Sequence, residues 1–163
     1  MKLWLIRHAK SSWGESSVSD FDRPLNGRGK RDGPHMAAWL AKQSDPATLI
    51  WSSSARRALA TTCFVQSGFG VEDGALTELD ELYLADSETL LDVIRRTPLE
   101  IRSAAVVAHN PGITHLVNVL GQKAVTDNLP TFGIARFDCA GDWHSLSSGA
   151  CTMELLAAPK TIA

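Results

Sequence analysis

Histidine and arginine side chains follow three short apolar runs of this 163-residue sequence. Arg7 and His8 come directly after the first run, Arg56 and Arg57 follow the second, and His109 follows the third. Guanidinium groups bind anions through paired N–H donors, and histidine can act as a nucleophile or exchange a proton near neutral pH. Cationic groups brought together would repel one another without an anion between them. The pattern therefore predicts an anion site, whose natural ligand is a phosphoryl group.

The apolar runs are typical of strands that are buried on both faces of a sheet. Segments with apolar residues three and four positions apart lie between and after them and predict helices. Pro34 leaves one helix start open, either near Asp32 or earlier with a kink at the proline. Strands alternating with helices indicate an α/β fold: a single-domain three-layer sandwich with a mainly parallel central sheet flanked by helices. The expected strands are residues 3–6, 48–51, 104–108, 132–138 and 152–157, and the expected helices include residues 36–41, 58–65, 87–96 and 113–120.

The carboxyl ends of parallel strands meet at one edge of such a sheet, where open α/β folds bind their ligands. The three apolar runs would therefore deliver their histidines and arginines to one place. Two helices are expected to begin at the same edge. Ser53 or Ser54 is the predicted N-cap of one, and Asn110 is predicted to cap the other, with Pro111 at its first position. Helix N-termini carry free N–H groups and partial positive charge, which again favour an anion.

Length and composition limit the fold and its partners. The formal net charge is −2, with 44% hydrophobic and 21% charged residues, which is typical of a globular chain, and we expect one domain over residues 1–163. The balanced charge argues against nucleic-acid binding. No apolar run is long enough for a membrane span or a signal peptide, so we expect a cytoplasmic protein without a membrane partner. The cysteines at positions 63, 139 and 151 are then expected to be reduced thiols.

Several other chemistries lack their motifs in this sequence. Arginines beside His8 and His109 would oppose a metal cation, and no metal or cofactor is expected. A phosphate-binding loop of the Walker type and a G-x-S-x-G elbow are both absent. His8 is therefore the candidate nucleophile. Its imidazole must be unprotonated to attack phosphorus, and the neighbouring arginines would lower its pKa. The group that fixes its tautomer is not identifiable from the sequence.

Four segments, in order, resemble motifs of the histidine phosphatase superfamily, which has the phosphoglycerate-mutase-like fold. Residues 5–9 resemble its Arg-His-Gly signature, and residues 23–29 resemble the segment that opens its first helix. Residues 53–61 resemble its second motif, and residues 107–110 resemble its strand ending in Gly-His. The short length, Arg-His-Ala-Lys-Ser-Ser-Trp and His-Asn-Pro-Gly resemble the SixA-type phosphohistidine phosphatases within that superfamily.

The resemblance implies a role for each matched residue. His8 would be the nucleophile, and the register of the second motif selects Arg57 over Arg56. Arg23 matches an arginine that reaches the phosphate in the SixA-type branch. The residues that would bind the phosphate are Arg7, Arg23, Arg57 and His109.

The resemblance is less specific about the general acid. Many family members use a carboxylate after the second motif or on an inserted cap. Glu81 is the closest positional match, and it is either that acid or a solvated loop carboxylate. His115 stands where members often carry a carboxylate, so its role is open. Trp13 is expected either at the edge of the pocket or buried against the surface.

The spacing of the motifs indicates an open site. About 45 residues separate Thr61 from Val107, which leaves no room for a large cap domain. An open site suits a side chain displayed on another protein, and a phosphoramidate needs less help from a general acid than an alkyl phosphate. We therefore expect a metal-independent phosphatase that forms a phosphohistidine intermediate and acts on phosphohistidine in proteins. The alternatives are a phosphomonoesterase for a sugar or metabolite phosphate and, less favoured, a non-catalytic phosphate-binding module.

Overall fold

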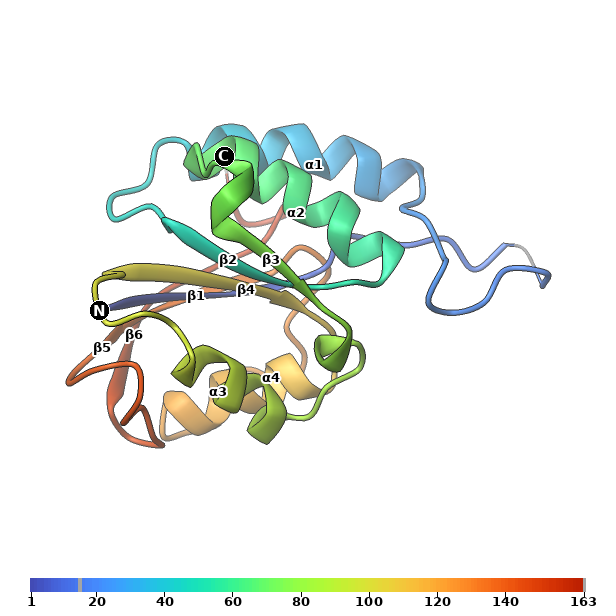
Figure 1. The fold of residues 1–163 in the computed structure, drawn as a ribbon. Coiled ribbons are helices and arrows are strands. Elements are labelled where there is room, and N and C mark those ends of the chain that lie inside the picture. The colour runs from blue at the N-terminus through green and yellow to red at the C-terminus, as the bar shows by residue number, and fades with distance from the viewer. Residues whose placement is uncertain (15, 163) are drawn as a thin grey trace.

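The computed structural model describes residues 1–14 and 16–162 and has three layers (Figure 1). Six strands form the middle layer in the order β3-β2-β4-β1-β5-β6. The strands β1 to β4 run parallel, whereas β5 is antiparallel to its neighbours β1 and β6. The strands are β1 Lys2–Arg7, β2 Leu49–Ser53, β3 Leu76–Leu79, β4 Ser103–Ala108, β5 Ile134–Cys139 and β6 Cys151–Ala157.

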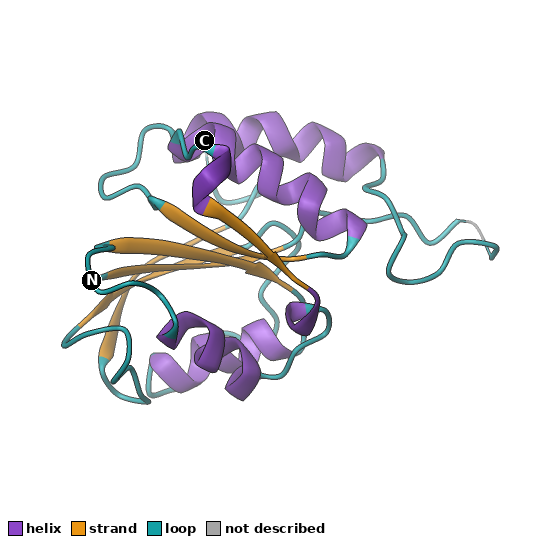
Figure 2. Cartoon of the chain, viewed as in Figure 1, coloured by secondary structure: helices purple, strands orange, loops and turns teal. Residues whose placement is uncertain are grey.

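Two pairs of helices cover the two faces of the sheet (Figure 2). The helices α1 (Gly27–Leu40) and α2 (Arg56–Phe69) pack on one face, and α3 (Ser87–Arg95) and α4 (Gly112–Leu120) pack on the other. Side chains alternate between the faces along β1. Leu3 and Leu5 join the core under α3 and α4, whereas Trp4 and Ile6 join the core under α1 and α2. The expected three-layer α/β architecture is confirmed.

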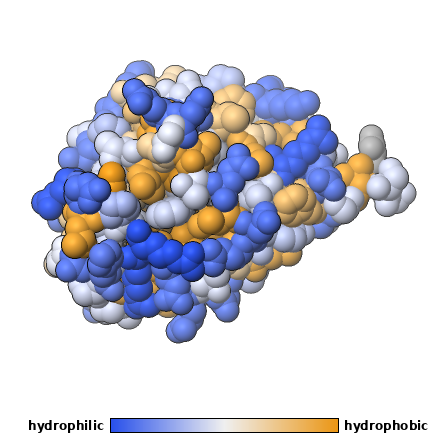
Figure 3. All heavy atoms as spheres, viewed as in Figure 1, coloured by the Kyte–Doolittle hydropathy of each residue, from blue (hydrophilic) through white to orange (hydrophobic). Residues whose placement is uncertain are grey.

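The edge strand β3 was not expected from the sequence. Its four residues, Leu-Thr-Glu-Leu, pair with β2 alone and are only partly buried. So short an edge segment has neither the continuous apolar run of a central strand nor a long alternation of apolar and polar residues. The sequence therefore gives no signal for it. Figure 3 shows hydrophobic side chains reaching the surface along the band between the two helical layers, where β3 lies.

The helix starts differ in detail from the expected ones. The helix α1 begins at Gly27, capped by Asn26, and therefore contains Pro34. This is the earlier of the two expected starts. The carbonyl group that Pro34 leaves without an intrahelical partner belongs to Lys30, which is exposed to water. The first turn of this helix packs closely on the chain after β1, since a Cβ added at Gly29 would lie 2.2 Å from the Lys10 carbonyl oxygen.

Neither predicted side-chain cap at the carboxyl edge of the sheet is formed. The N-cap of α2 is Ala55, whose own N–H donates to Ser53 Oγ. The N-cap of α4 is Pro111, because the Asn110 side chain instead binds residues 114, 128 and 129. The Ser53 and Asn110 side chains instead make contacts with residues far away in the sequence. The sequence around each helix start does not reveal such contacts.

The expectation of three reduced cysteines is wrong for two of them. Cys139 and Cys151 form a disulfide, whereas Cys63 is free and exposed. The two bonded residues lie directly opposite each other in the β5–β6 register. Their pairing depends on that register and leaves no CxxC signature in the sequence.

The segment between α2 and β4 is compact. Residues 70–102 form β3, α3 and the two 3₁₀ turns Asp73–Ala75 and Asp80–Leu82, and no separate cap is inserted among them. The long connection between β1 and α1 instead projects from the carboxyl edge of the sheet (Figure 1). Among the described helices, none is long and apolar enough to cross a membrane.

Candidate active site

Three adjacent central strands bring the predicted site residues together. The strands β2, β4 and β1 lie side by side in the sheet, and their carboxyl ends point the same way. His8 follows β1 and His109 follows β4, and their ring centroids lie 5.1 Å apart. Arg57 comes from the first turn of α2, directly after β2. The topology of the sheet thus brings His8 together with residues that lie 49 and 101 positions further along the chain.

The His8 ring is oriented and kept neutral by its surroundings. Its Nδ1 lies 2.8 Å from the carbonyl oxygen of Ala9. A carbonyl oxygen only accepts, so Nδ1 carries the proton and Nε2 is unprotonated. Arg57 Nε lies 3.3 Å from that Nε2 and donates to it. This backbone carbonyl is the tautomer-fixing partner that the sequence left unassigned.

The pKa of His8 is lowered from 6.5 to about 4. Burial of the ring is the largest cause, and the positive charges of Arg57, Arg7 and Arg23 lower the pKa further. The hydrogen bond to the Ala9 carbonyl acts in the opposite direction. Burial, rather than the arginines that the sequence indicates, is therefore the main cause of the neutral form.

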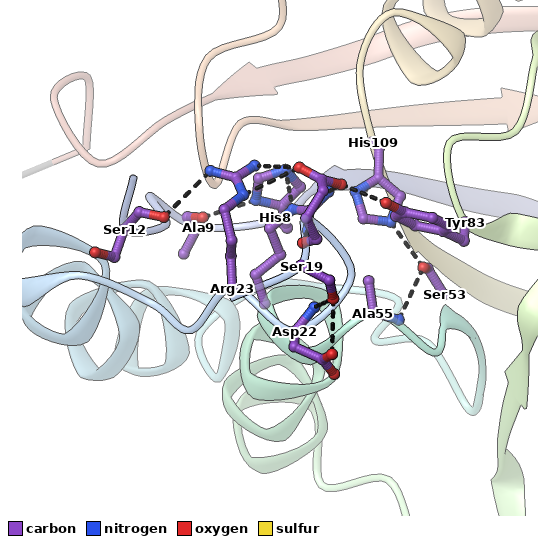
Figure 4. A network of polar contacts seen from close by, with 12 residues as sticks. His8, Ala9, Ser12, Ser19, Asp22, Arg23, Ser53, Ala55, Tyr83 and His109 are labelled. Atoms are coloured by element: carbon purple, nitrogen blue, oxygen red, sulfur yellow. Dashed lines mark hydrogen bonds and ion pairs between the residues drawn. The ribbon is translucent and has the colours of Figure 1, made fainter. Parts of the chain in front are cut away.

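His109 is almost fully buried and lines the pocket. Its Nε2 lies 2.7 Å from Ser53 Oγ (Figure 4). Its Nδ1 is buried and, within the described part of the chain, has no hydrogen-bond partner. Burial, and then the neighbouring His8 and Arg57, lower its pKa to about 3. His109 is therefore neutral, and it can serve as an N–H donor to an anion if Ser53 donates its hydroxyl proton to Nε2.

The arginines converge on the same region from different elements. Arg57 is almost fully buried, and its guanidinium donates to Asp20, to the carbonyl oxygen at 2.6 Å and to Oδ2 at 3.1 Å. Arg23 donates to Oδ1 of the same carboxylate at 3.0 Å. Arg7 is held by the Leu129 carbonyl at 2.8 Å, and its buried Nε has no partner among the described residues. Three guanidinium groups therefore lie around the same pocket.

These side chains line a pocket of about 290 Å³. Five of the six predicted site residues are brought together in it. Trp13, which was expected either at the pocket edge or buried, lines the pocket and is 76% exposed. The lining residues are Arg7, His8, Lys10, Ser11, Trp13, Asp20, Arg23, Arg57, Leu84, His109, Asn110 and Thr131.

Glu81 does not join this group. It lies on the 3₁₀ turn Asp80–Leu82, where its two carboxylate oxygens accept from Arg96 at 2.6 and 3.0 Å. That hydrogen bond lowers the pKa of Glu81, so its carboxylate is ionised. His115 and Arg56 are exposed and do not line the pocket.

The sequence did not single out Asp20, which lines the pocket, or Tyr83, which contacts two of the lining residues. The Tyr83 hydroxyl donates to Asp20, and the Tyr83 ring packs edge-on against His109 at a centroid distance of 5.6 Å (Figure 4). Partial burial raises the pKa of Asp20, but the Tyr83 hydroxyl and the Arg57 and Arg23 charges outweigh it and lower the pKa below 3.8. The pocket carboxylate is therefore ionised as well.

The arrangement suits transfer of a phosphoryl group to a histidine. A neutral ring presents an unprotonated Nε2, and guanidinium and imidazole N–H donors surround it. Such donors stabilise the charge on the equatorial oxygens of a phosphoryl group in the transition state of its transfer.

Comparison with known proteins identifies the family. The family model for the histidine phosphatase superfamily (branch 1) matches residues 3–117, most of the chain. The chain belongs to the histidine phosphatase superfamily. This membership supports phosphatase activity and agrees with the pocket geometry.

The similarity to individual proteins covers nearly the whole length of this histidine phosphatase. An uncharacterized chloroplastic protein of Arabidopsis thaliana is 39% identical over 172 residues, which cover 97% of this chain and 78% of that protein. A structure from Agrobacterium tumefaciens that bears the SixA name is 30% identical, with a TM-score of 0.82 and 97% of each chain covered. The protein histidine phosphatase SixA, solved with tungstate, shares the fold at 24% identity, with a TM-score of 0.81 and 98% of each chain covered.

Proposed function

We propose that this histidine phosphatase hydrolyses phosphohistidine on proteins and forms a covalent phosphohistidine on its own His8. The observation that carries the proposal is the state of the pocket groups. The nucleophilic nitrogen is free of a proton, whereas the pocket carboxylate, Asp20, is ionised. The site thus offers a nucleophile and charge stabilisation, and the carboxylate that lines the pocket, Asp20, holds no proton for a leaving group.

This combination favours a phosphoramidate over an alkyl phosphate. An alkoxide leaves poorly unless an acid protonates it. The imidazole of phosphohistidine can be protonated by solvent on its far nitrogen and then leaves as a neutral ring. Glu81, ionised and paired with Arg96, is not used as an acid in this proposal.

The proposed reaction has two steps. His8 Nε2 attacks phosphorus in line with the substrate P–N bond, which breaks, and its electron pair goes to the departing imidazole. A water oxygen then attacks the phosphorus of phospho-His8 and loses a proton to solvent. The P–Nε2 electron pair returns to His8, and inorganic phosphate is released. Arg7, Arg23, Arg57 and His109 bind the phosphoryl oxygens throughout.

The openness of the site supports a protein substrate. No cap is inserted between α2 and β4, so a side chain on another protein can enter from the carboxyl edge of the sheet. The structural relative solved with tungstate is named a protein histidine phosphatase.

The test is phosphate release from a phosphohistidine-bearing phosphotransfer domain, in the presence of EDTA, by the wild type and His8→Ala. A small phosphomonoester such as p-nitrophenyl phosphate is assayed in parallel. We expect release from the phosphoprotein by the wild type alone. Release from the monoester alone would establish the small-molecule alternative, and binding of phosphate without turnover of either substrate would establish a binding module.

A further inference from the structure

Two exposed apolar side chains stand at the mouth of the active-site pocket. Trp13 and Leu84 both line it and are 76% and 52% exposed. They come from different segments, Trp13 from the connection after β1 and Leu84 from the turn that precedes α3. The other large hydrophobic side chains that are exposed in the described part of the chain are Leu99, Val119 and Leu156. None of these lines the pocket. Single exposed apolar residues are ordinary, but two at one functional opening mark an interaction site.

Trp13 is held by a contact with one of the phosphate-site arginines. The Arg23 guanidinium carbon lies 3.6 Å from the centre of its ring, in a cation–π stack. Arg23 is itself fixed by hydrogen bonds to Asp20 and to the Ser12 carbonyl. The indole is therefore positioned by the phosphate site, while most of its surface is open to a partner. An ordered aromatic ring loses little conformational entropy on binding.

Leu84 lies in the turn before α3, where its backbone adopts an unfavourable conformation. Its φ is +50°, in the left-handed region that residues with a Cβ rarely adopt. The neighbouring Tyr83 is tied to Asp20, and the following Ala85 packs so closely on α4 that a Cβ at Gly112 would lie 1.8 Å from its carbonyl oxygen. The turn thus directs Tyr83 toward the pocket while the side chain of Leu84 stays exposed. Strained residues of this kind cluster at functional sites.

We propose that Trp13 and Leu84 form an apolar rim that docks the surface around the phosphorylated side chain of a partner protein. The inference rests on the proposed function. The pocket volume of about 290 Å³ is at the small end for ligand sites, which run from roughly 300 to 1,000 Å³. Its cationic interior complements a phosphoryl group, so the rest of any larger substrate must lie on the rim. Apolar groups there complement a folded protein with apolar residues beside its phosphorylated side chain, and tryptophan is one of the residues enriched at such contact points.

The test compares two substrates and uses a matched control. Leu84→Ala and Trp13→Ala are assayed on a phosphohistidine-bearing phosphotransfer domain and on free phosphohistidine. The control is Leu99→Ala, since Leu99 is 54% exposed and lies outside the pocket. For each rim variant we expect kcat/KM to fall about tenfold on the phosphoprotein, mainly through KM, and much less on free phosphohistidine. Trp13→Phe should recover most of the loss, and Leu99→Ala should leave both substrates unchanged.

The outcomes separate the two proposals. If the wild type releases no phosphate from the phosphoprotein, the proposed function fails and the rim proposal with it. If the wild type is active but the rim variants match Leu99→Ala, the proposed function stands and the rim proposal is overturned. Equal losses on both substrates would also overturn it, because they would show that Trp13 and Leu84 act on the pocket rather than on a docked protein.

Discussion

Replacing Arg57 by alanine should lower kcat/KM by about 10²–10³-fold, the loss typical of removing one preorganised donor from a developing anion. The Arg57 side chain is 2% exposed, and its Nε lies 3.3 Å from the attacking Nε2 of His8. An alanine there would leave water in place of a fixed cation. The rate factor corresponds to about 2.7–4 kcal/mol of transition-state stabilisation.

The neighbouring arginine supplies the control for this prediction. Arg56 begins the same helix but is exposed and outside the pocket. Arg56→Ala should therefore keep kcat/KM within about twofold of the wild type. Arg57→Lys keeps the charge but loses the forked donors, so its loss should be intermediate. Because Arg57 also binds Asp20, thermal unfolding of each variant must show that it is folded.

The assay is steady-state phosphate release from a phosphohistidine substrate. An Arg57→Ala enzyme within about threefold of the wild type would refute the reasoning, because a donor beside the nucleophile would then contribute almost nothing. An equal loss in Arg56→Ala would also refute it.

Three further predictions concern the two histidines. The His8 ring should titrate near pH 4, because burial lowers its pKa, and above that pH it should be neutral with its proton on Nδ1. ¹⁵N NMR of the ring measures both the midpoint and the tautomer, and a midpoint near pH 6.5 would contradict the prediction. His8 and His109 bind protons less well in the folded state, so the free energy of unfolding should decrease as pH falls from about 6.5 to about 4; urea titrations that show no decrease there would count against it. Ser53→Ala should lower kcat up to about tenfold by releasing His109, whereas Ser54→Ala, which loses a contact to Asp80, should not; equal effects would exclude this role for Ser53.

The sequence predicted the part of the site that the sheet topology determines. Buried parallel strands are continuously apolar, so their ends are visible as the points where polar residues resume. That rule located Arg7, His8 and His109, and the family motif chose between Arg56 and Arg57. Parallel pairing of β2, β4 and β1 then brings these residues together without further information.

The remaining features depend on contacts that spacing does not encode. Asp20 lies in a long connection, and its partners Arg57 and Tyr83 are 37 and 63 positions away. The partner of His8 Nδ1 is a backbone carbonyl, which any residue type supplies. The disulfide depends on the register between β5 and β6. The main cause of the low His8 pKa is burial, which is a property of the packed fold.

The central claim is that His8 carries the phosphoryl group through Nε2. The direct measurement is to mix the enzyme with phosphohistidine substrate, quench it in alkaline denaturant within the first turnover, and map the phosphorylated residue by mass spectrometry. We expect an acid-labile phosphoryl group on His8 Nε2, because Nδ1 is engaged by the Ala9 carbonyl, and none in His8→Ala. A phosphoryl group on His109 or on His8 Nδ1, or rapid phosphate release by His8→Ala, would contradict it.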